Sequence, residues 1–245
     1  MKTKKIAASA ALIEDLVAAS RILANEGVLD AYGHVSARSD KRPERFIMSR
    51  SRAPALMTAA DVMELGPDSE AVSDKRKGFI ERYIHGEIYR TRPDVRAIVH
   101  SHADSVVPFG VTGGRLRPVY HMASFLWSGV PVFDMRKFRA ESDLLVRDRA
   151  TGAALAGALG PCPCVLMRGH GMTVVGETIP EVVFRAVYTA KNAKLQLQAL
   201  QLEGPVEFLS DAEGRLATAT NRPTIERPWE LWKKKALATK RGPSR

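Results

Sequence analysis

Hydrophobic and polar residues recur along the chain at helical spacing in several stretches. One pattern covers residues 11–23 and stops at Gly27, and a longer one begins at Thr178 and stops at Gly204. These patterns predict two long amphipathic helices. Shorter helices are predicted at residues 59–65, with Thr58 as N-cap, and at 75–92 and 141–159, and residues 103–114 are predicted to form a short helix followed by a loop.

Strands are predicted where apolar residues alternate with polar ones or form short runs, at residues 45–49, 95–102, 129–134, 164–168 and 172–176. The last two flank a tight Gly-His-Gly turn, which predicts a hairpin with His170 at its tip. Because helices and strands mix throughout, we expect one α/β domain over residues 1–245, with helices on both faces of its sheet.

Two of the six histidines lie at the end of the predicted strand 95–102. Side chains in a strand alternate between faces, so His100 and His102 project the same way and can share one ion. Buried in a core strand, these rings would otherwise lack polar partners. His170, held between two glycines, is the best third metal ligand, and Glu81 is placed to supply a carboxylate.

Simpler structural roles compete with these functional ones. His85 lies one helical turn after Glu81, and we interpret the two as a surface pair along one helix face rather than as ligands. For His170 taken alone, a simple exposed position competes with the ligand role, because a histidine in a turn is commonly just exposed.

Composition limits the classes of partner. With 245 residues, 45% of them hydrophobic, the chain can bury a full core. No segment approaches the roughly 18 apolar residues of a membrane helix, so we expect a cytoplasmic protein without a membrane partner. The net charge of +10 fits a small anionic substrate better than nucleic acid, because the basic runs lack interleaved aromatic residues. The basic end, residues 232–245, is predicted to be solvated and partly disordered.

Three motifs, in order, resemble the class II aldolase and adducin family: YGHVSAR (32–38), ERYIHGEIYRTRPDVRAIVHSHA (81–103) and LMRGHGMTVVG (166–176). The resemblance covers about residues 11–203. It implies a three-layer α/β/α fold with a mixed, mostly antiparallel sheet, assembled as a homotetramer with sites at subunit interfaces. Residues 205–245 lie beyond it, and we expect them to form an extension that packs at such an interface.

The resemblance also assigns roles to single residues. It implies that His100, His102 and His170 bind a divalent metal ion, zinc or manganese, and that Glu81 is both a ligand and the catalytic acid/base. His121 falls where the family's sugar aldolases often have a tyrosine that donates a proton across the subunit interface, so we expect His121 to be a second proton donor.

Three departures concern phosphate binding in the family's sugar-phosphate aldolases. His34 replaces a usual asparagine, an arginine-rich loop at 49–54 replaces a Thr-Pro-Ser-Gly-like loop, and residues 78–80 replace small hydroxyl residues. Arginine forks and an apolar wall fit a flat ring that carries carboxylates. The chain is therefore most similar to the family's aromatic decarboxylases, of the 3-hydroxy-2-methylpyridine-4,5-dicarboxylate and dihydroxyphthalate type. The expected substrate-binding residues are His34, Ser49, Arg50 and Arg52.

The expected activity is metal-dependent decarboxylation of a hydroxylated aromatic or pyridine dicarboxylate, with Glu81 or His121 returning a proton to the ring. One alternative is an aldolase that cleaves a sugar phosphate or a hydroxy-keto acid. Another is a non-catalytic scaffold, since adducin-type members keep the fold for assembly.

Overall fold

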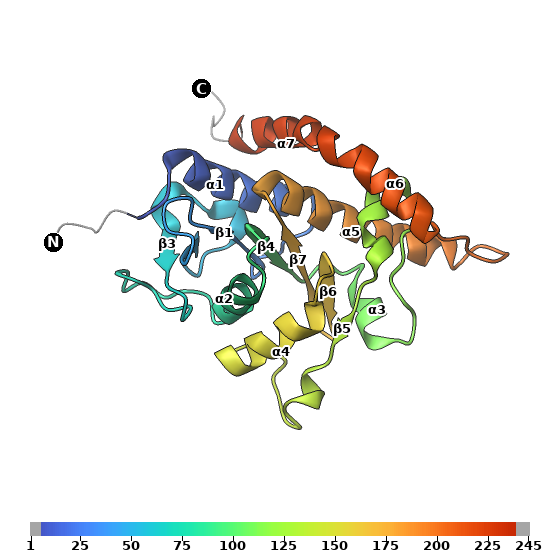
Figure 1. Ribbon diagram of the computed structural model, residues 1–245, viewed down its shortest axis with the longest axis horizontal. Coiled ribbons are helices and arrows are strands. Elements are labelled where there is room, and N and C mark those ends of the chain that lie inside the picture. The colour runs from blue at the N-terminus through green and yellow to red at the C-terminus, as the bar shows by residue number, and fades with distance from the viewer. Residues whose placement is uncertain (1–5, 239–245) are drawn as a thin grey trace, which may run out of the picture.

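The computed structural model describes residues 6–238 and is built around a seven-stranded sheet (Figure 1). Its spatial order is β3-β2-β1-β4-β7-β6-β5, and every pair of neighbours is antiparallel except β5 and β6. The mixed, mostly antiparallel sheet is therefore confirmed. The strands are β1 (His34–Arg38), β2 (Phe46–Ser49), β3 (Val62–Leu65), β4 (Ala97–Ser101), β5 (Val132–Phe133), β6 (Cys164–Met167) and β7 (Gly171–Gly176).

Helices cover both faces of the sheet, as predicted (Figure 1). The side-chain alternation of β4 shows the division, because Ala97 and Val99 join one hydrophobic core while Ile98 joins the other. On the first face lie α1 (Ala10–Asn25), α5 (Ile179–Ala199) and α7 (Glu226–Ala238), and on the second α2 (Arg82–Thr91) and α4 (Arg149–Leu159). The helices α3 (Val107–Val111) and α6 (Asp211–Asn221) complete the α-helices of the described residues.

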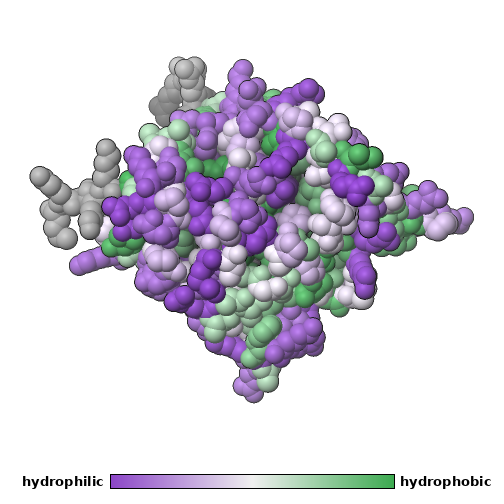
Figure 2. Space-filling view, viewed as in Figure 1, coloured by the Kyte–Doolittle hydropathy of each residue, from purple (hydrophilic) through white to green (hydrophobic). Residues whose placement is uncertain are grey.

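The surface is largely hydrophilic in the view of Figure 2, with weakly hydrophobic residues gathered at its lower centre, over α4. That helix is built mainly of alanine, glycine and leucine. Within residues 6–238, every helix is too short or too polar to cross a bilayer.

Several predicted element boundaries are confirmed. Thr178 caps α5, its side chain accepting a hydrogen bond from the Glu181 backbone N–H. The hairpin of β6 and β7 carries His170 in its turn. A Cβ atom at Gly171 would lie 2.1 Å from the Ser101 carbonyl oxygen, so only glycine lets the hairpin approach the end of β4 this closely.

Three helices are shorter than the pattern predicted. The helix expected at 59–65 is one 3₁₀ turn, Ala59–Asp61, and the rest is strand β3, because Val62–Leu65 pairs with β2 at the sheet edge. The helix expected at 75–92 begins only at Arg82, since the segment before it runs beside the preceding loop, where the Ser51 N–H donates to the Lys77 carbonyl.

The helix expected at 141–159 begins only at Arg149. Aspartate side chains compete locally for the backbone N–H groups before it: Asp143 accepts from Leu145, and Asp148 accepts from Thr151 as the true N-cap. These bonds favour a turn followed by a late helix start.

The C-terminal segment is more ordered than expected. Residues 232–238 belong to α7, where Trp229, Trp232 and Ala236 are buried against α1 and α5. The expectation of a solvated tail is therefore wrong for 232–238, because two tryptophans at helical spacing anchor the segment to the core. The remainder, 239–245, lies outside the described residues.

Candidate metal centre and adjoining pocket

Four side chains converge where the end of β4 meets the β6–β7 turn. His100 lies in β4, His102 follows it, His170 comes from the turn, and Glu81 immediately precedes α2. The Nε2 atom of His102 lies 3.2 Å from that of His100 and 3.1 Å from that of His170. A Glu81 carboxylate oxygen lies 3.5 Å from Nε2 of both His100 and His170.

These distances fit a bound divalent cation. An ion about 2.0–2.2 Å from each donor holds neighbouring donors about 3–4 Å apart. Three imidazoles and one carboxylate are ligands that zinc, manganese, cobalt and iron all accept. Within the described residues, this is the group of donors close enough to hold an ion.

The second ring nitrogen of each histidine is engaged elsewhere, which leaves its Nε2 lone pair for an ion. His102 Nδ1 lies 3.0 Å from an Asp30 carboxylate oxygen, and His170 Nδ1 lies 3.0 Å from the Leu144 carbonyl oxygen. Asp30 is itself fixed by the backbone N–H groups of residues 32 and 33, each 2.8 Å from its other oxygen.

The electrostatics favour a negative ligand at Glu81. Burial raises the pKa of Glu81, but the hydrogen bonds and positive charge of His100 and His170 outweigh it and hold this pKa far below the usual range. Burial lowers the pKa of His100, whereas the pairing with Glu81 overcomes burial at His170 and raises its pKa. The carboxylate is therefore the favoured form of Glu81 at neutral pH.

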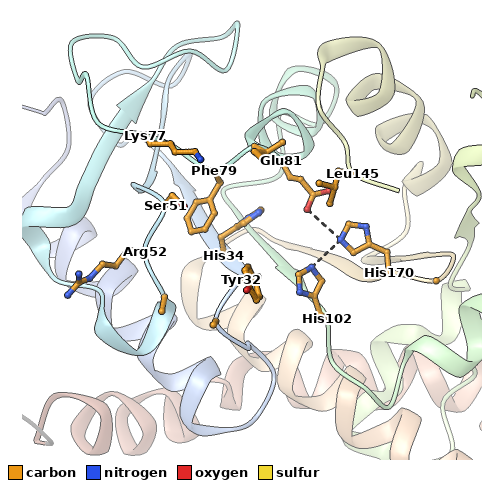
Figure 3. A pocket seen from close by; sticks show the side chains of 15 residues that line it. Tyr32, His34, Ser51, Arg52, Lys77, Phe79, Glu81, His102, Leu145 and His170 are labelled. Atoms are coloured by element: carbon orange, nitrogen blue, oxygen red, sulfur yellow. Dashed lines mark hydrogen bonds and ion pairs between the residues drawn. The ribbon is translucent and has the colours of Figure 1, made fainter. Parts of the chain in front are cut away.

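A pocket of about 570 Å³, lined in part by Glu81, His102 and His170, opens beside the candidate metal centre (Figure 3). Its wall is formed by Phe79 and Ile80 on one side and Tyr32 on another. His34 lies next to Phe79, with ring centroids 4.5 Å apart. Such a cavity, mostly apolar with a few polar groups and adjoining donors for a metal, can hold a flat ring with one edge at the ion.

The predicted substrate residues are not all in this pocket. His34 lines it and Arg52 lies at its rim, although the Arg52 guanidinium points away from the ligands in Figure 3. Arg50 instead pairs with Asp61 at 2.8 Å, and the Ser49 hydroxyl donates to the Arg50 carbonyl. Neither Arg50 nor Ser49 lines this pocket, because the capping turn that contains Asp61 draws Arg50 away, and their role in substrate binding stays a prediction.

Lys77 is a pocket residue that the sequence did not reveal. Its ammonium points into the pocket beside Phe79 in Figure 3 and has no ion-pair partner among residues 6–238. The only signal was its position before the sequence Gly-Phe-Ile that replaces the family's hydroxyl residues, and a lysine in a basic loop is usually solvated.

His121 lies outside the pocket. It is exposed at the start of a 3₁₀ helix, His121–Ser128, and its carbonyl accepts a hydrogen bond from Asn221. Within one chain its imidazole does not reach the four ligands, so a proton-donating role requires a neighbouring subunit.

His85 is also placed differently from its prediction. The ring is fully buried, and it forms hydrogen bonds to His34 at 2.7 Å and to Ser36 at 2.6 Å. The surface-pair interpretation with Glu81 is wrong, because α2 lays this helix face on the sheet. Burial and the nearby charge of His100 lower the pKa of His85 to about 3, and burial also lowers that of His34.

Comparison with known proteins gives a consistent picture. Residues 14–197 match the family described as Class II Aldolase and Adducin N-terminal domain. Decarboxylase tropJ of Talaromyces stipitatus is 39% identical over 90% of this chain and 92% of its own. The 3,4-dihydroxyphthalate decarboxylase of Arthrobacter keyseri is 30% identical over 82% of this chain and 83% of its own.

A solved structure shows the same fold. The L-fuculose 1-phosphate aldolase from Glaciozyma antarctica superposes with a TM-score of 0.78, at 23% identity, over 97% of this chain and 94% of its own.

Proposed function

Since the chain belongs to the class II aldolase and adducin family, we propose that it is a divalent-metal-dependent decarboxylase of a hydroxylated aromatic or pyridine dicarboxylate. The relatives named decarboxylases and the aldolase fold both support a carbon–carbon lyase. The observation that carries the proposal is the meeting of three Nε2 atoms and Glu81 at the edge of a pocket that is lined by apolar residues and by Lys77.

The residues present fit a metal ion, with His100, His102, His170 and Glu81 as its ligands. A divalent cation there supplies a Lewis acid that draws electron density from an oxygen beside the reacting carbon. Phe79 offers a face for the ring, and Lys77 attracts the carboxylate that is retained. These contacts hold the scissile carboxylate next to Glu81.

Proton transfer completes the reaction. The bond between ring carbon and carboxylate breaks, carbon dioxide leaves, and the electron pair stays on the ring until a proton replaces the lost group. Glu81, favoured as a carboxylate at neutral pH, accepts the proton of the ring hydroxyl and returns it to carbon. His121 of a neighbouring copy is the alternative donor, which requires the predicted homotetramer or another closed oligomer.

The deciding experiment offers the zinc- or manganese-loaded protein two probes, 3,4-dihydroxyphthalate and L-fuculose 1-phosphate. We expect carbon dioxide from the first and no aldehyde from the second. Formation of aldehyde without carbon dioxide would show that the protein is an aldolase and not a decarboxylase. A protein that binds neither zinc nor manganese would favour a non-catalytic scaffold.

Two cations at the pocket rim test the substrate class. Lys77→Ala is expected to raise the KM for a dicarboxylate by about tenfold or more, and that for the corresponding monocarboxylate much less, because one charge-assisted contact contributes about 1.5–3 kcal/mol. Arg52→Ala is expected to act in the same direction but more weakly, since its guanidinium points outward. If a variant raised the KM for both substrates equally, the replaced residue would not bind the retained carboxylate.

A further inference from the structure

A chain of hydrogen bonds between four buried side chains runs from the pocket into the protein interior. His34 Nδ1 lies 2.7 Å from His85 Nε2, and His85 Nδ1 lies 2.6 Å from the Ser36 hydroxyl. The Ser36 hydroxyl in turn lies 2.8 Å from the Tyr89 hydroxyl. All four residues are at most 6% exposed.

Two regular elements create this chain. His34 and Ser36 alternate onto the same face of β1, while His85 and Tyr89 lie one turn apart on α2. Packing α2 on that face of the sheet puts the two polar pairs in register. Each of the five side-chain atoms that form these hydrogen bonds has a partner within the described residues.

The hydrogen-bond network has a preferred direction, because the group at its far end, the Tyr89 hydroxyl, must donate its proton and has one acceptor. Among the described residues, the Tyr89 hydroxyl contacts only Ser36 as a hydrogen-bond partner. A buried O–H without an acceptor is costly, so Tyr89 donates to Ser36 and Ser36 donates to His85 Nδ1. In the reverse direction the Tyr89 proton would have no acceptor.

The direction then fixes both imidazoles. Each neutral ring carries one N–H. If His85 Nδ1 accepts, its proton is on Nε2 and is donated to His34 Nδ1. The remaining proton of His34 must then lie on its own Nε2, which has no protein partner within residues 6–238 and is not sealed in the interior. Since the ring lines the pocket, this N–H faces the substrate space.

We propose that Ser36 and His85 are positioning residues that hold His34 as the Nε2–H tautomer, a fixed hydrogen-bond donor to an anionic oxygen of the substrate, and that Tyr89 only completes the far end of the network by donating to Ser36. The acceptor is a carboxylate or phenolate of the aromatic ring, and only this identity rests on the function proposed above. A ring free to change tautomer would present a lone pair to the same oxygen for part of the time and repel it.

The test measures tautomers directly, without turnover. In the full-length, zinc-loaded protein with ¹⁵N-labelled histidine, His34 and His85 are each identified by the signals lost in His34→Gln and His85→Gln. We expect both rings to be protonated at Nε2 and not at Nδ1. A His34 ring protonated at Nδ1, or averaged between the two forms, would overturn the proposal whatever the enzyme's activity.

Two variants distinguish the direction of donation along the network from the simple loss of one of its hydrogen bonds. Tyr89→Phe leaves Ser36 with His85 Nδ1 as its acceptor, so the His34 tautomer is expected to stay unchanged. A shift in this variant would mean that the chain runs the other way. Ser36→Ala removes the donor to His85, and water entering the space can donate or accept, so mixed tautomers are expected at both rings.

Binding of phthalate, an unreactive dicarboxylate probe, connects the tautomer to recognition. We expect Ser36→Ala to weaken phthalate binding about two- to tenfold, the inverse of the fraction of His34 rings that keep the proton on Nε2, and more than Tyr89→Phe does. Mixed tautomers with unchanged phthalate affinity would show that the His34 N–H does not bind the anion. Failure of catalysis with Nε2–H tautomers intact would instead count against the proposed function alone.

Discussion

The contact between Asp30 and His102 predicts how a residue outside the ligand set controls metal affinity. Asp30→Asn keeps the shape of the side chain but replaces one acceptor oxygen by an NH₂ donor. With its oxygen on the backbone N–H groups of residues 32 and 33, both 2.8 Å away in the wild type, the new NH₂ faces His102 Nδ1. The opposite amide orientation creates two donor–donor contacts instead of one and is less favourable.

Because the new NH₂ group donates to Nδ1 of His102, the favoured tautomer of His102 carries its proton on Nε2. That proton occupies the atom that must bind the metal. Loss of such outer contacts costs about 10- to 100-fold in metal affinity, or about 1.4–2.7 kcal/mol. Because the Asp30 side chain is 46% exposed, solvent screening favours the lower end of this range, about tenfold.

The assay is competition for zinc between the protein and a chelating dye. Asp40→Asn is the matched control, since Asp40 also accepts a backbone N–H, from Ser9, but lies in an exposed turn away from the ligands. Thermal unfolding without metal checks that both variants are folded. Zinc dissociation constants that agree within about twofold for the two variants would refute the tautomer reasoning.

Three further predictions concern acid stability, the subunit interface and the C-terminal helix. The pKa of His85 is about 3 in the folded chain and 6.5 when unfolded, so below pH 6.5 the unfolded state binds the extra proton. Stability of the metal-free protein should therefore fall by about 1.4 kcal/mol per pH unit from this ring as pH drops towards 3, and urea unfolding of His85→Gln should show a flatter profile. If sites are shared between subunits, mixing inactive Glu81→Gln and His121→Ala proteins should restore about a quarter of wild-type activity, and no recovery would exclude His121 as a donor in trans. Trp232→Ala should lower the free energy of unfolding in urea by about 3 kcal/mol. Leu231→Ala, which changes the half-exposed neighbour, should lower it by well under 1 kcal/mol, and equal losses would contradict the packing of α7 on the core.

Local patterns anticipated much of the ligand set. His100 and His102 lie two residues apart at the end of a strand, and His170 occupies a two-glycine turn, so each can be recognised within a few residues of sequence. In the structure, the Nε2 atom of His102 lies 3.2 Å from that of His100 and 3.1 Å from that of His170. Their role as metal ligands stays a prediction until an ion is measured.

The boundaries of α2 and α4 were less predictable, since hydrophobic spacing extends past the point where a helix actually starts. Before α4, aspartate side chains capture backbone N–H groups, and before α2 the chain follows the neighbouring loop. These hydrogen bonds contribute small local free energies, and the hydrophobic periodicity of the sequence does not reveal them.

By itself, the sequence determined the alternation of helices and strands, the histidine-bearing strand end and the hairpin, because periodicity and turn chemistry act between near neighbours. Only the tertiary structure decided which polar groups meet. His34 and His85 are 51 residues apart, and His102 and Asp30 are 72 apart. Such pairs depend on how α2 and the strand connections pack on the sheet, and a buried polar side chain becomes readable only when its distant partner is in place.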